Sequence, residues 1–194
     1  MSHSNSLKLA SMLTCLFAFT LFLAGSSDAG GQVAGSQVQL AGHTPHQVLN
    51  GEAVRVSHYD PEQKLRLAIF VTPRDLAGQE KLLNELQDKK SPNFHKFLSA
   101  EEWNARFAPR VEDEQAVVDW AKSQGLTVTN RFSNRMLVDV EAPSAVIEKA
   151  LGVTLNRYQV GDEVDFSNDR DPSIPVRLSG IIGGIFGLGW MMHR

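Results

Sequence analysis

The stretch 125–152, GLTVTNRFSNRMLVDVEAPSAVIEKALG, has the pattern of two strands followed by a helix. Apolar and polar residues alternate on both sides of the short Ser133–Asn134 turn, as expected for a hairpin with one buried face. The alternating apolar residues are Leu126, Val128 and Phe132 before the turn and Met136, Val138 and Val140 after it. Pro143 stands where a helix is favoured to start, and Gly152 is a typical helix end. The stretch therefore predicts a β-hairpin that leads directly into a helix.

The segments on either side extend this pattern. Residues 65–71 alternate as a strand does, and residues 76–89 and 113–124 carry apolar residues at helical spacing. A last strand is predicted at residues 153–160. The order of strand, helices, strand, strand, helix, strand is the split βαβ or ferredoxin-like pattern. The predicted fold class is α+β, with an antiparallel sheet that has helices on one face and leaves the other open to a partner.

The stretch Ser91–Pro109, SPNFHKFLSAEEWNARFAP, contains four aromatic residues and a helix start. Ser99 and Glu102 have the spacing of a capping box, so a helix is predicted to begin there and to end before Pro109. His95 is flanked by two phenylalanines and has no nucleophile near it in the sequence. We interpret His95 as a residue of a hinge or partner surface, because a general base needs a group to act upon.

The 194 residues carry a formal net charge of −3, whereas a nucleic-acid-binding domain usually has a basic patch. The sequence has none of the common hydrolase, zinc-peptidase, phosphate-loop or dinucleotide motifs. Several carboxylates are interpreted as a solvated helix surface; they are Glu101, Glu102, Glu112, Asp113 and Glu114. His43 and His46 lack the further ligands that a stable metal site needs. We therefore predict no catalytic residue, no cofactor and no metal.

Residues 1–29 have the features of a secretory signal peptide. An apolar run at residues 9–24 follows a weakly basic start and precedes small residues that suit cleavage. This run is shorter than the roughly 20 residues of a spanning helix, although an uncleaved anchor or a lipoprotein at Cys15 are alternatives. The signal predicts a secreted or periplasmic protein that leaves the membrane after cleavage.

Three further regions follow the signal. Residues 30–60 are interpreted as a flexible lead-in, because they are rich in Gly, Gln, Ala and Ser without an apolar period. Residues 61–160 are the predicted folded domain, and residues 161–194 the predicted linker. The apolar, glycine-rich end at 179–194 is expected to be exposed. Insertion of this end into a membrane is an alternative, although it is short for a spanning segment.

Several of these segments occur together in one known family. The stretch SPNFHKFLSAEEW at 91–103 is followed by FAP at 107–109, GLTV at 125–128 and EKALGVTLNRY at 148–158. Ile174-Pro175 and Gly187-Leu188 follow. In order and spacing, residues 65–188 resemble the pro-kumamolisin activation domain, the propeptide of sedolisin-type serine-carboxyl peptidases.

The resemblance implies a ferredoxin-like prodomain, as in sedolisin-type and subtilisin-type proenzymes. Such a prodomain helps the peptidase fold, blocks its active-site cleft and is removed autocatalytically at acidic pH. The resemblance also implies a large catalytic domain with a Glu, two Asp residues, a Ser in a G-T-S motif and a calcium site. These 194 residues contain no G-T-S motif, so no catalytic residue has a matching position. We therefore expect this polypeptide not to be an enzyme.

The leading hypothesis is an inhibitor or folding-chaperone module for a sedolisin-type catalytic domain, in cis in a full-length relative or in trans. The sheet face and the stretch 165–175, DFSNDRDPSIP, are expected to meet the enzyme, because this stretch is polar, extended by prolines and accessible to proteases. Candidate partner-contact or processing residues are His95, Asp165, Asp169, Asp171, Pro172, Ile174 and Pro175. Contacts made by the carboxylates would be lost in acid, which would release the module.

Two alternatives remain open from the sequence. The chain can be a remnant of a proenzyme cut short by a stop or a frameshift, with no activity of its own. It can also be an unrelated secreted ferredoxin-like binding module, which would need a pocket with converging polar groups.

Overall fold

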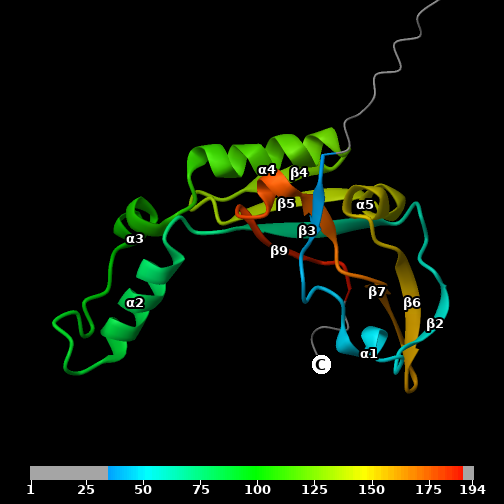
Figure 1. Cartoon of the computed structure of the whole chain (residues 1–194), viewed down its shortest axis with the longest axis horizontal. Coiled ribbons are helices and arrows are strands. Elements are labelled where there is room, and N and C mark those ends of the chain that lie inside the picture. The colour runs from blue at the N-terminus through cyan, green and yellow to red at the C-terminus, as the bar shows by residue number, and fades with distance from the viewer. Residues whose placement is uncertain (1–34, 190–194) are drawn as a thin grey trace, which may run out of the picture. The chain divides into compact units, whose positions relative to one another are not determined.

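A four-stranded antiparallel sheet lies at the centre of the fold in the computed structural model, which describes residues 35–189 (Figure 1). In spatial order its strands are β4 (Thr127–Arg131), β5 (Leu137–Pro143), β3 (Lys64–Val71) and β9 (Ile182–Phe186). Two helices, α4 (Val111–Ser123) and α5 (Ser144–Leu151), contact this sheet and lie along the same side of it. The predicted signal peptide and residues 190–194 lie outside the described residues.

The alternating apolar residues of the strands build the core between sheet and helices. Ile69 on β3 is fully buried and is paired with Val138 on β5 and Ile185 on β9. Val117 and Ile147 bring the apolar faces of α4 and α5 onto the same cluster. Each fully buried side chain of this type contributes about 1.5–3 kcal/mol to the free energy of folding. The predicted hairpin, the helix after it and the α+β class with antiparallel strands are thus confirmed.

The last predicted strand does not join this sheet. It forms the middle strand of a separate antiparallel sheet, in the order β2 (Val54–His58), β6 (Leu155–Val160) and β7 (Glu163–Asn168). The position beside β3 that a split βαβ pattern would give to this strand is taken by β9. A third, two-stranded sheet pairs β1 (Gln37–Gln39) with β8 (Ser173–Pro175). Short helices α1 (His46–Leu49) and η1 (Val176–Leu178) complete this part of the chain.

The apolar stretch at the end of the chain is not exposed over its described residues. Ile182, Ile185 and Leu188 are each at most 3% exposed and belong to the central core. Gly183 permits the close approach of β9, because a Cβ there would lie 2.8 Å from a ring carbon of Phe70. The expectation of an exposed tail after residue 179 is therefore wrong: its isoleucines cover one end of the core, and its glycines fit a crowded strand.

Helices α2 (Leu76–Gln87) and α3 (Ala100–Phe107) form a separate small cluster. The capping box is confirmed, because Ser99 Oγ accepts from Glu102 N at 3.1 Å and Glu102 Oε2 accepts from Ser99 N at 2.8 Å. The rings of Trp103 and Phe107 lie 4.8 Å apart. Phe107 is buried with Leu82 and Leu86 of α2, outside the core of the central sheet.

Glu114 is buried, which corrects its interpretation as a solvated carboxylate. It lies on α4 and is only 3% exposed. Arg131 at the end of β4 donates to both of its oxygens, at 2.9 and 2.7 Å. Hydrogen bonding to Glu114 raises the pKa of the Arg131 guanidinium. The burial of Glu114 could not be read from its own helix, because it depends on Arg131 on another element. A charged side chain is rarely buried unless it is paired with an opposite charge.

Arg74, just after β3, holds the end of α3. Its guanidinium donates to three backbone carbonyl oxygens, at 3.0 Å to Ala108, 3.2 Å to Asn104 and 2.7 Å to Ala105. These carbonyls belong to the last turn of α3 and to its C-cap Ala108, where few backbone N–H groups are available to bond them.

We predict that Arg74→Ala lowers the free energy of unfolding by about 1–3 kcal/mol, because hydrogen bonds from a charged donor are lost at a helix end. Urea denaturation measures the loss. Arg110→Ala is the matched control, since Arg110 makes no side-chain hydrogen bond as the N-cap of α4. Equal stability of the Arg74→Ala variant and the unchanged protein would contradict the prediction.

Within residues 35–189, none of the helices has both the length and the apolar content that crossing a membrane requires.

Candidate partner-binding surface

The side of the central sheet that faces away from α4 and α5 carries exposed and half-exposed side chains. The alternate residues of β3 that point to this side are Lys64, Arg66, Ala68 and Phe70. Ala68 is paired with Asp139 on β5 and with Phe186 on β9, so these three side chains lie in one row across the sheet. Phe186 is 50% exposed. We call this side of β3, β5 and β9 the open face.

The open face has a charged end. Glu141 on β5 lies 3.1 Å from Arg66 Nε and 3.5 Å from Lys64 Nζ. The hydrogen bond from Arg66 is the main cause that lowers the pKa of Glu141, with a smaller contribution from the charge of Lys64. Both cations remain largely exposed, so the pair leaves positive charge available at this end of the face.

A shallow groove of ≈ 520 Å³ lies on the open face. It is lined by Arg66, Ala68, Asp139, Phe186 and Gly187, together with residues of β4. Gly187 has a φ of +100°, and a Cβ there would lie 2.5 Å from the backbone oxygen of Arg66. The chain can turn away from β9 at this point only with glycine. Ala68 and Phe186 therefore give the groove an apolar part, Arg66 and Asp139 give it charges, and the backbone at Gly187 closes one side.

The stretch 165–175 is extended in β7 and β8, as expected, but it is not an accessible segment. Pro172 and Ile174 are buried, and β8 places Ile174 opposite Val38 and Pro175 opposite Gln37 of β1. Pro172 O also accepts a hydrogen bond from Leu40 N at 2.8 Å. The expectation of protease accessibility here is wrong, because the lead-in pairs with this stretch from more than 120 residues away in sequence.

Asp171 holds the lead-in against this stretch. Its carboxylate accepts from His43 N at 2.9 Å, from Gly42 N at 3.2 Å and from Thr44 Oγ1 at 2.8 Å. Burial would raise the pKa of Asp171, but the Thr44 hydroxyl and the two backbone N–H groups outweigh it and hold the pKa below its ordinary value. The carboxylate is thus engaged within the domain.

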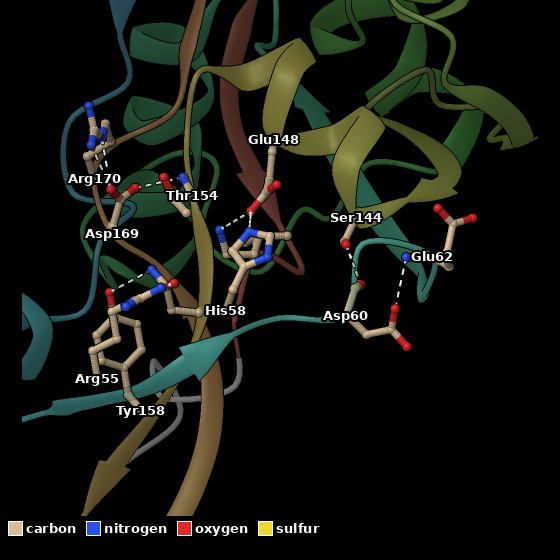
Figure 2. Close-up of polar contacts among 12 residues, drawn as sticks. Arg55, His58, Asp60, Glu62, Ser144, Glu148, Thr154, Tyr158, Asp169 and Arg170 are labelled. Atoms are coloured by element: carbon tan, nitrogen blue, oxygen red, sulfur yellow. Dashed lines mark hydrogen bonds and ion pairs between the residues drawn. The ribbon is translucent and has the colours of Figure 1, made fainter.

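Asp169 is engaged in a similar way (Figure 2). It accepts from Thr154 N at 2.7 Å and pairs with Arg170 at 2.7 Å. Burial would raise the pKa of Asp169, but the hydrogen bonds from Arg170 and from Thr154 N–H lower it overall. Asp169 and Asp171 therefore join β6 and the lead-in to the segment between β7 and β8.

The lowered pKa values predict acid sensitivity of this junction. A carboxyl with a depressed pKa in the folded state stabilises the fold above its unfolded-state pKa, near 3.9, and loses that contribution as pH falls through the folded value. We expect Asp171→Asn to lower the free energy of unfolding by about 1–2 kcal/mol at neutral pH and to reduce the loss of stability below about pH 4. Urea titrations from neutral to acidic pH test this.

The control for this prediction is Asp162→Asn in the exposed turn between β6 and β7. It should leave both the stability and its pH dependence as they are. If Asp171→Asn unfolds in acid as the unchanged protein does, the junction is not the acid-sensitive element.

Asp165 and His95 lie apart from this junction. Asp165 on β7 lines a pocket of ≈ 490 Å³ together with His58 and Arg157. His95 follows α2 and is exposed, with a φ of +55° that is uncommon for a non-glycine residue. Its ring stacks on Phe94 at 3.8 Å, and neighbouring Phe97 is 74% exposed. A role of His95 in partner contact stays a prediction.

Two histidines with specific partners were missed by the sequence reading. His58 Nε2 lies 2.8 Å from Glu148 Oε1, which also accepts from Leu155 N at 2.6 Å, so β2, α5 and β6 meet at one carboxylate (Figure 2). His43 joins the lead-in to β9 through Ile185 N at 3.0 Å. The sequence offered one indication of this contact, because Glu148 lies within the EKALG stretch at 148–152. Among the described residues, no group of three or more His, Cys, Asp or Glu side chains is placed to hold a metal ion.

Comparison with known proteins identifies the family. Residues 52–189 match the family described as pro-kumamolisin, activation domain. Sedolisin from Pseudomonas sp. is 25% identical over 145 residues, which cover 75% of this chain and 25% of sedolisin. Aorsin from Aspergillus oryzae is 26% identical over 118 residues, covering 60% of this chain and 18% of aorsin. Physarolisin from Physarum polycephalum is 31% identical over 98 residues, which cover 50% of this chain and 17% of physarolisin.

The match spans a quarter or less of the length of each of these relatives. It reaches residue 189, so it includes the strands from β7 to β9 that the sequence reading assigned to a linker. The quoted motifs from residue 91 to 158 all fall within it. Because this family matches more than half of the chain, the chain belongs to the pro-kumamolisin activation domain family of sedolisin-type peptidase proenzymes.

Proposed function

We propose that this domain binds the catalytic domain of a sedolisin-type peptidase through its open face, inhibits it and assists its folding. The observation that carries this proposal is the row of Ala68, Asp139 and Phe186 beside a groove on the open face. A sheet side with an aromatic residue half exposed and a charged rim has the composition of a protein-binding surface. The family membership supplies the class of partner.

The arrangement of the open face suits a second protein surface better than a small ligand. The groove is shallow and the side chains around it come from neighbouring strands, so a partner would contact a flat area. Stable interfaces bury roughly 800 Å² on each partner, with an apolar centre and a polar rim. Phe70, Ala68 and Phe186 can form such a centre, and Lys64, Arg66 and Glu141 such a rim.

The end of the described chain leaves the domain beside this face. Gly187 lies close to the backbone oxygen of Arg66 on β3, and Gly189 lies close to the backbone oxygen of Phe166 on β7. In a proenzyme, a following catalytic domain would therefore start close to the surface that we propose to bind it. This position supports action in cis, and the same face can act in trans on a separate peptidase.

Acidic release follows from the carboxylates that face a partner or hold the domain together. Protonation of Glu141 would remove its pairing with Arg66 and change the charge of the rim, and protonation of Asp169 and Asp171 would loosen the junction with the lead-in. Each of these pKa values is lowered in the folded state, so each contribution is present at neutral pH and lost in strong acid. Secretion through the predicted signal at residues 1–29 would place the domain with extracellular or periplasmic peptidases.

A titration calorimetry experiment with the mature catalytic domain of Pseudomonas sedolisin tests the proposal. We expect binding with a dissociation constant of roughly 1 μM or tighter at neutral pH and at least tenfold weaker binding in strong acid, below the ordinary carboxyl pKa values of about 4. Hydrolysis of a fluorogenic peptide should slow in proportion to the bound fraction. The absence of binding at neutral pH, tested also with the catalytic domains of aorsin and physarolisin, would contradict the proposal.

A further inference from the structure

His43 lies where three separate parts of the chain meet. It follows β1 in the lead-in, and its backbone N donates to Asp171 Oδ1 at 2.9 Å. Its backbone O accepts from Asn168 Nδ2 at 3.0 Å. Its imidazole reaches the third part, with Nε2 placed 3.0 Å from Ile185 N on β9. A single residue thus connects the lead-in, the segment after β7 and the outer strand of the central sheet.

The partners of the ring determine which nitrogen carries the proton. Nδ1 lies 3.0 Å from Leu40 O and 3.2 Å from Ala41 O, and both oxygens can only accept. Nε2 faces the backbone N–H of Ile185, which can only donate. Nδ1 must therefore carry the hydrogen and Nε2 must be bare, which is the neutral imidazole. In a doubly protonated ring, the N–H at Nε2 would face the backbone N–H of Ile185, and neither group could accept a hydrogen bond.

The contact satisfies a backbone group that has no partner in the sheet on that side. β9 is the outer strand, with β3 on its inner side only. Ile185 is 1% exposed, so water does not replace His43 without rearrangement. A Cβ on Gly184 would lie 3.3 Å from Nε2, so the ring packs tightly over the strand. A buried N–H that loses its acceptor weakens the strand that carries it.

The charged surroundings of the ring are sparse. The charge bonded to the backbone of His43 is Asp171, whose carboxylate is already engaged by three donors from residues 42–44. Asp169 and Arg170 are paired with each other. The strands β1, β8 and β9 have the sequences QVQ, SIP and IGGIF and present no titratable side chain. The exposed His46 lies on α1.

We propose that His43 is a proton-operated latch on β9: the neutral imidazole holds the outer edge of the strand at Ile185, and protonation releases it. A histidine changes its charge between about pH 5 and pH 8, above the range in which carboxyl groups are protonated. Opening of the latch therefore requires a protonation of its own, separate from that of the carboxyl groups at the junction of Asp169 and Asp171. Because β9 ends beside the open face, its release loosens the end of the domain from which the chain leaves.

Amide hydrogen exchange followed by nuclear magnetic resonance tests the latch without any peptidase. The protection factor of the Ile185 amide, normalised for the intrinsic effect of pH, should fall about fivefold to tenfold between about pH 7.5 and pH 5. The amide of Val138, in the middle of the sheet, should keep its protection. Equal protection of Ile185 at both pH values would overturn the proposal.

Variants separate the latch from a general effect of acid. His43→Gln keeps an acceptor without a titrating group, so protection of Ile185 should not depend on pH over this range. His43→Leu removes the acceptor, so protection should be low at both pH values. His46→Gln is the matched control and should behave as the unchanged protein does. If the protection of Ile185 in His43→Gln falls with pH as much as it does in the unchanged protein, the latch is refuted.

A direct measurement covers the case in which the variants do not fold. Nitrogen-15 spectra of the imidazole in the unchanged protein report which ring nitrogen carries hydrogen. The proposal requires a bare Nε2 in His43 at about pH 7.5. A hydrogen on Nε2 at that pH would contradict it.

Discussion

Ala68→Arg is expected to weaken binding to a sedolisin-type catalytic domain by about 100-fold or more, corresponding to about 2.7 kcal/mol. Ala68 lies between Asp139 and Phe186 and lines the groove on the open face. A long charged side chain there would fill the groove and hold a partner surface away. The loss should appear mainly in the dissociation rate, which surface plasmon resonance measures.

Ala145→Arg is the matched control for this variant. Ala145 is exposed on α5, the helix that lies along the other side of the sheet (Figure 1). The same substitution there should leave binding unchanged. Both variants should unfold in urea within about 1 kcal/mol of the unchanged protein, because Ala145 is exposed and the half-buried Ala68 lies on the side of the sheet away from the core. Equal binding by the two variants would exclude the open face as the contact surface.

Arg131→Met should destabilise the domain by about 3 kcal/mol, the largest effect expected from a single change outside the apolar core. The substitution leaves the carboxylate of Glu114, 3% exposed, without its cation and without two hydrogen bonds. We take the lower end of the range for broken buried pairs because the arginine side chain is 42% exposed. Urea denaturation at neutral pH measures the loss.

The cause of this loss can be separated from a change in packing. Glu114→Gln in combination with Arg131→Met removes the buried charge and should restore about half or more of the lost stability. If the double variant is no more stable than Arg131→Met, an uncompensated charge is not the cause.

Local pattern was sufficient for the elements whose signals are close in sequence. The hairpin at residues 125–143 and the helix after it have alternating apolar residues, a turn and a glycine end, and all three are in the structure. The alternation is wrong only at Phe132, which is 39% exposed because the register of β4 shifts between Val128 and Asn130. Pro143 precedes the helix as its N-cap instead of starting it. The capping box of Ser99 and Glu102 was visible because both residues belong to one helical turn.

The remaining features depend on pairings between distant parts of the chain. β9 has two adjacent glycines and alternates poorly, and it becomes a strand because β3 offers it an edge. Residues 37–44 form an ordered segment because Asp171 and β8 meet them from across the domain. Glu114 was assigned to solvent because Arg131 is 17 residues away on another element. No periodicity within a short window carries this information.

The sequence predicted that one face of the sheet is open, but it predicted only some of the residues on that face. An open sheet face was expected from the order of elements, and the groove beside Phe186 lies on that face. The residues around β9 could not be assigned to it, because the sequence placed this strand in a linker. The side chains of Asp169, Asp171 and Ile174 are bonded or buried within the domain, and their contact with a partner stays a prediction.

Site-specific photo-crosslinking tests the central claim, binding of a peptidase domain by the open face, most directly. A photoreactive phenylalanine derivative is placed at Phe186 on the open face, or at Phe97, which is more exposed but lies after α2. After irradiation with the mature catalytic domain of Pseudomonas sedolisin at neutral pH, we predict a covalent product from position 186 and little from position 97. A product from position 97 and none from position 186 would contradict the account.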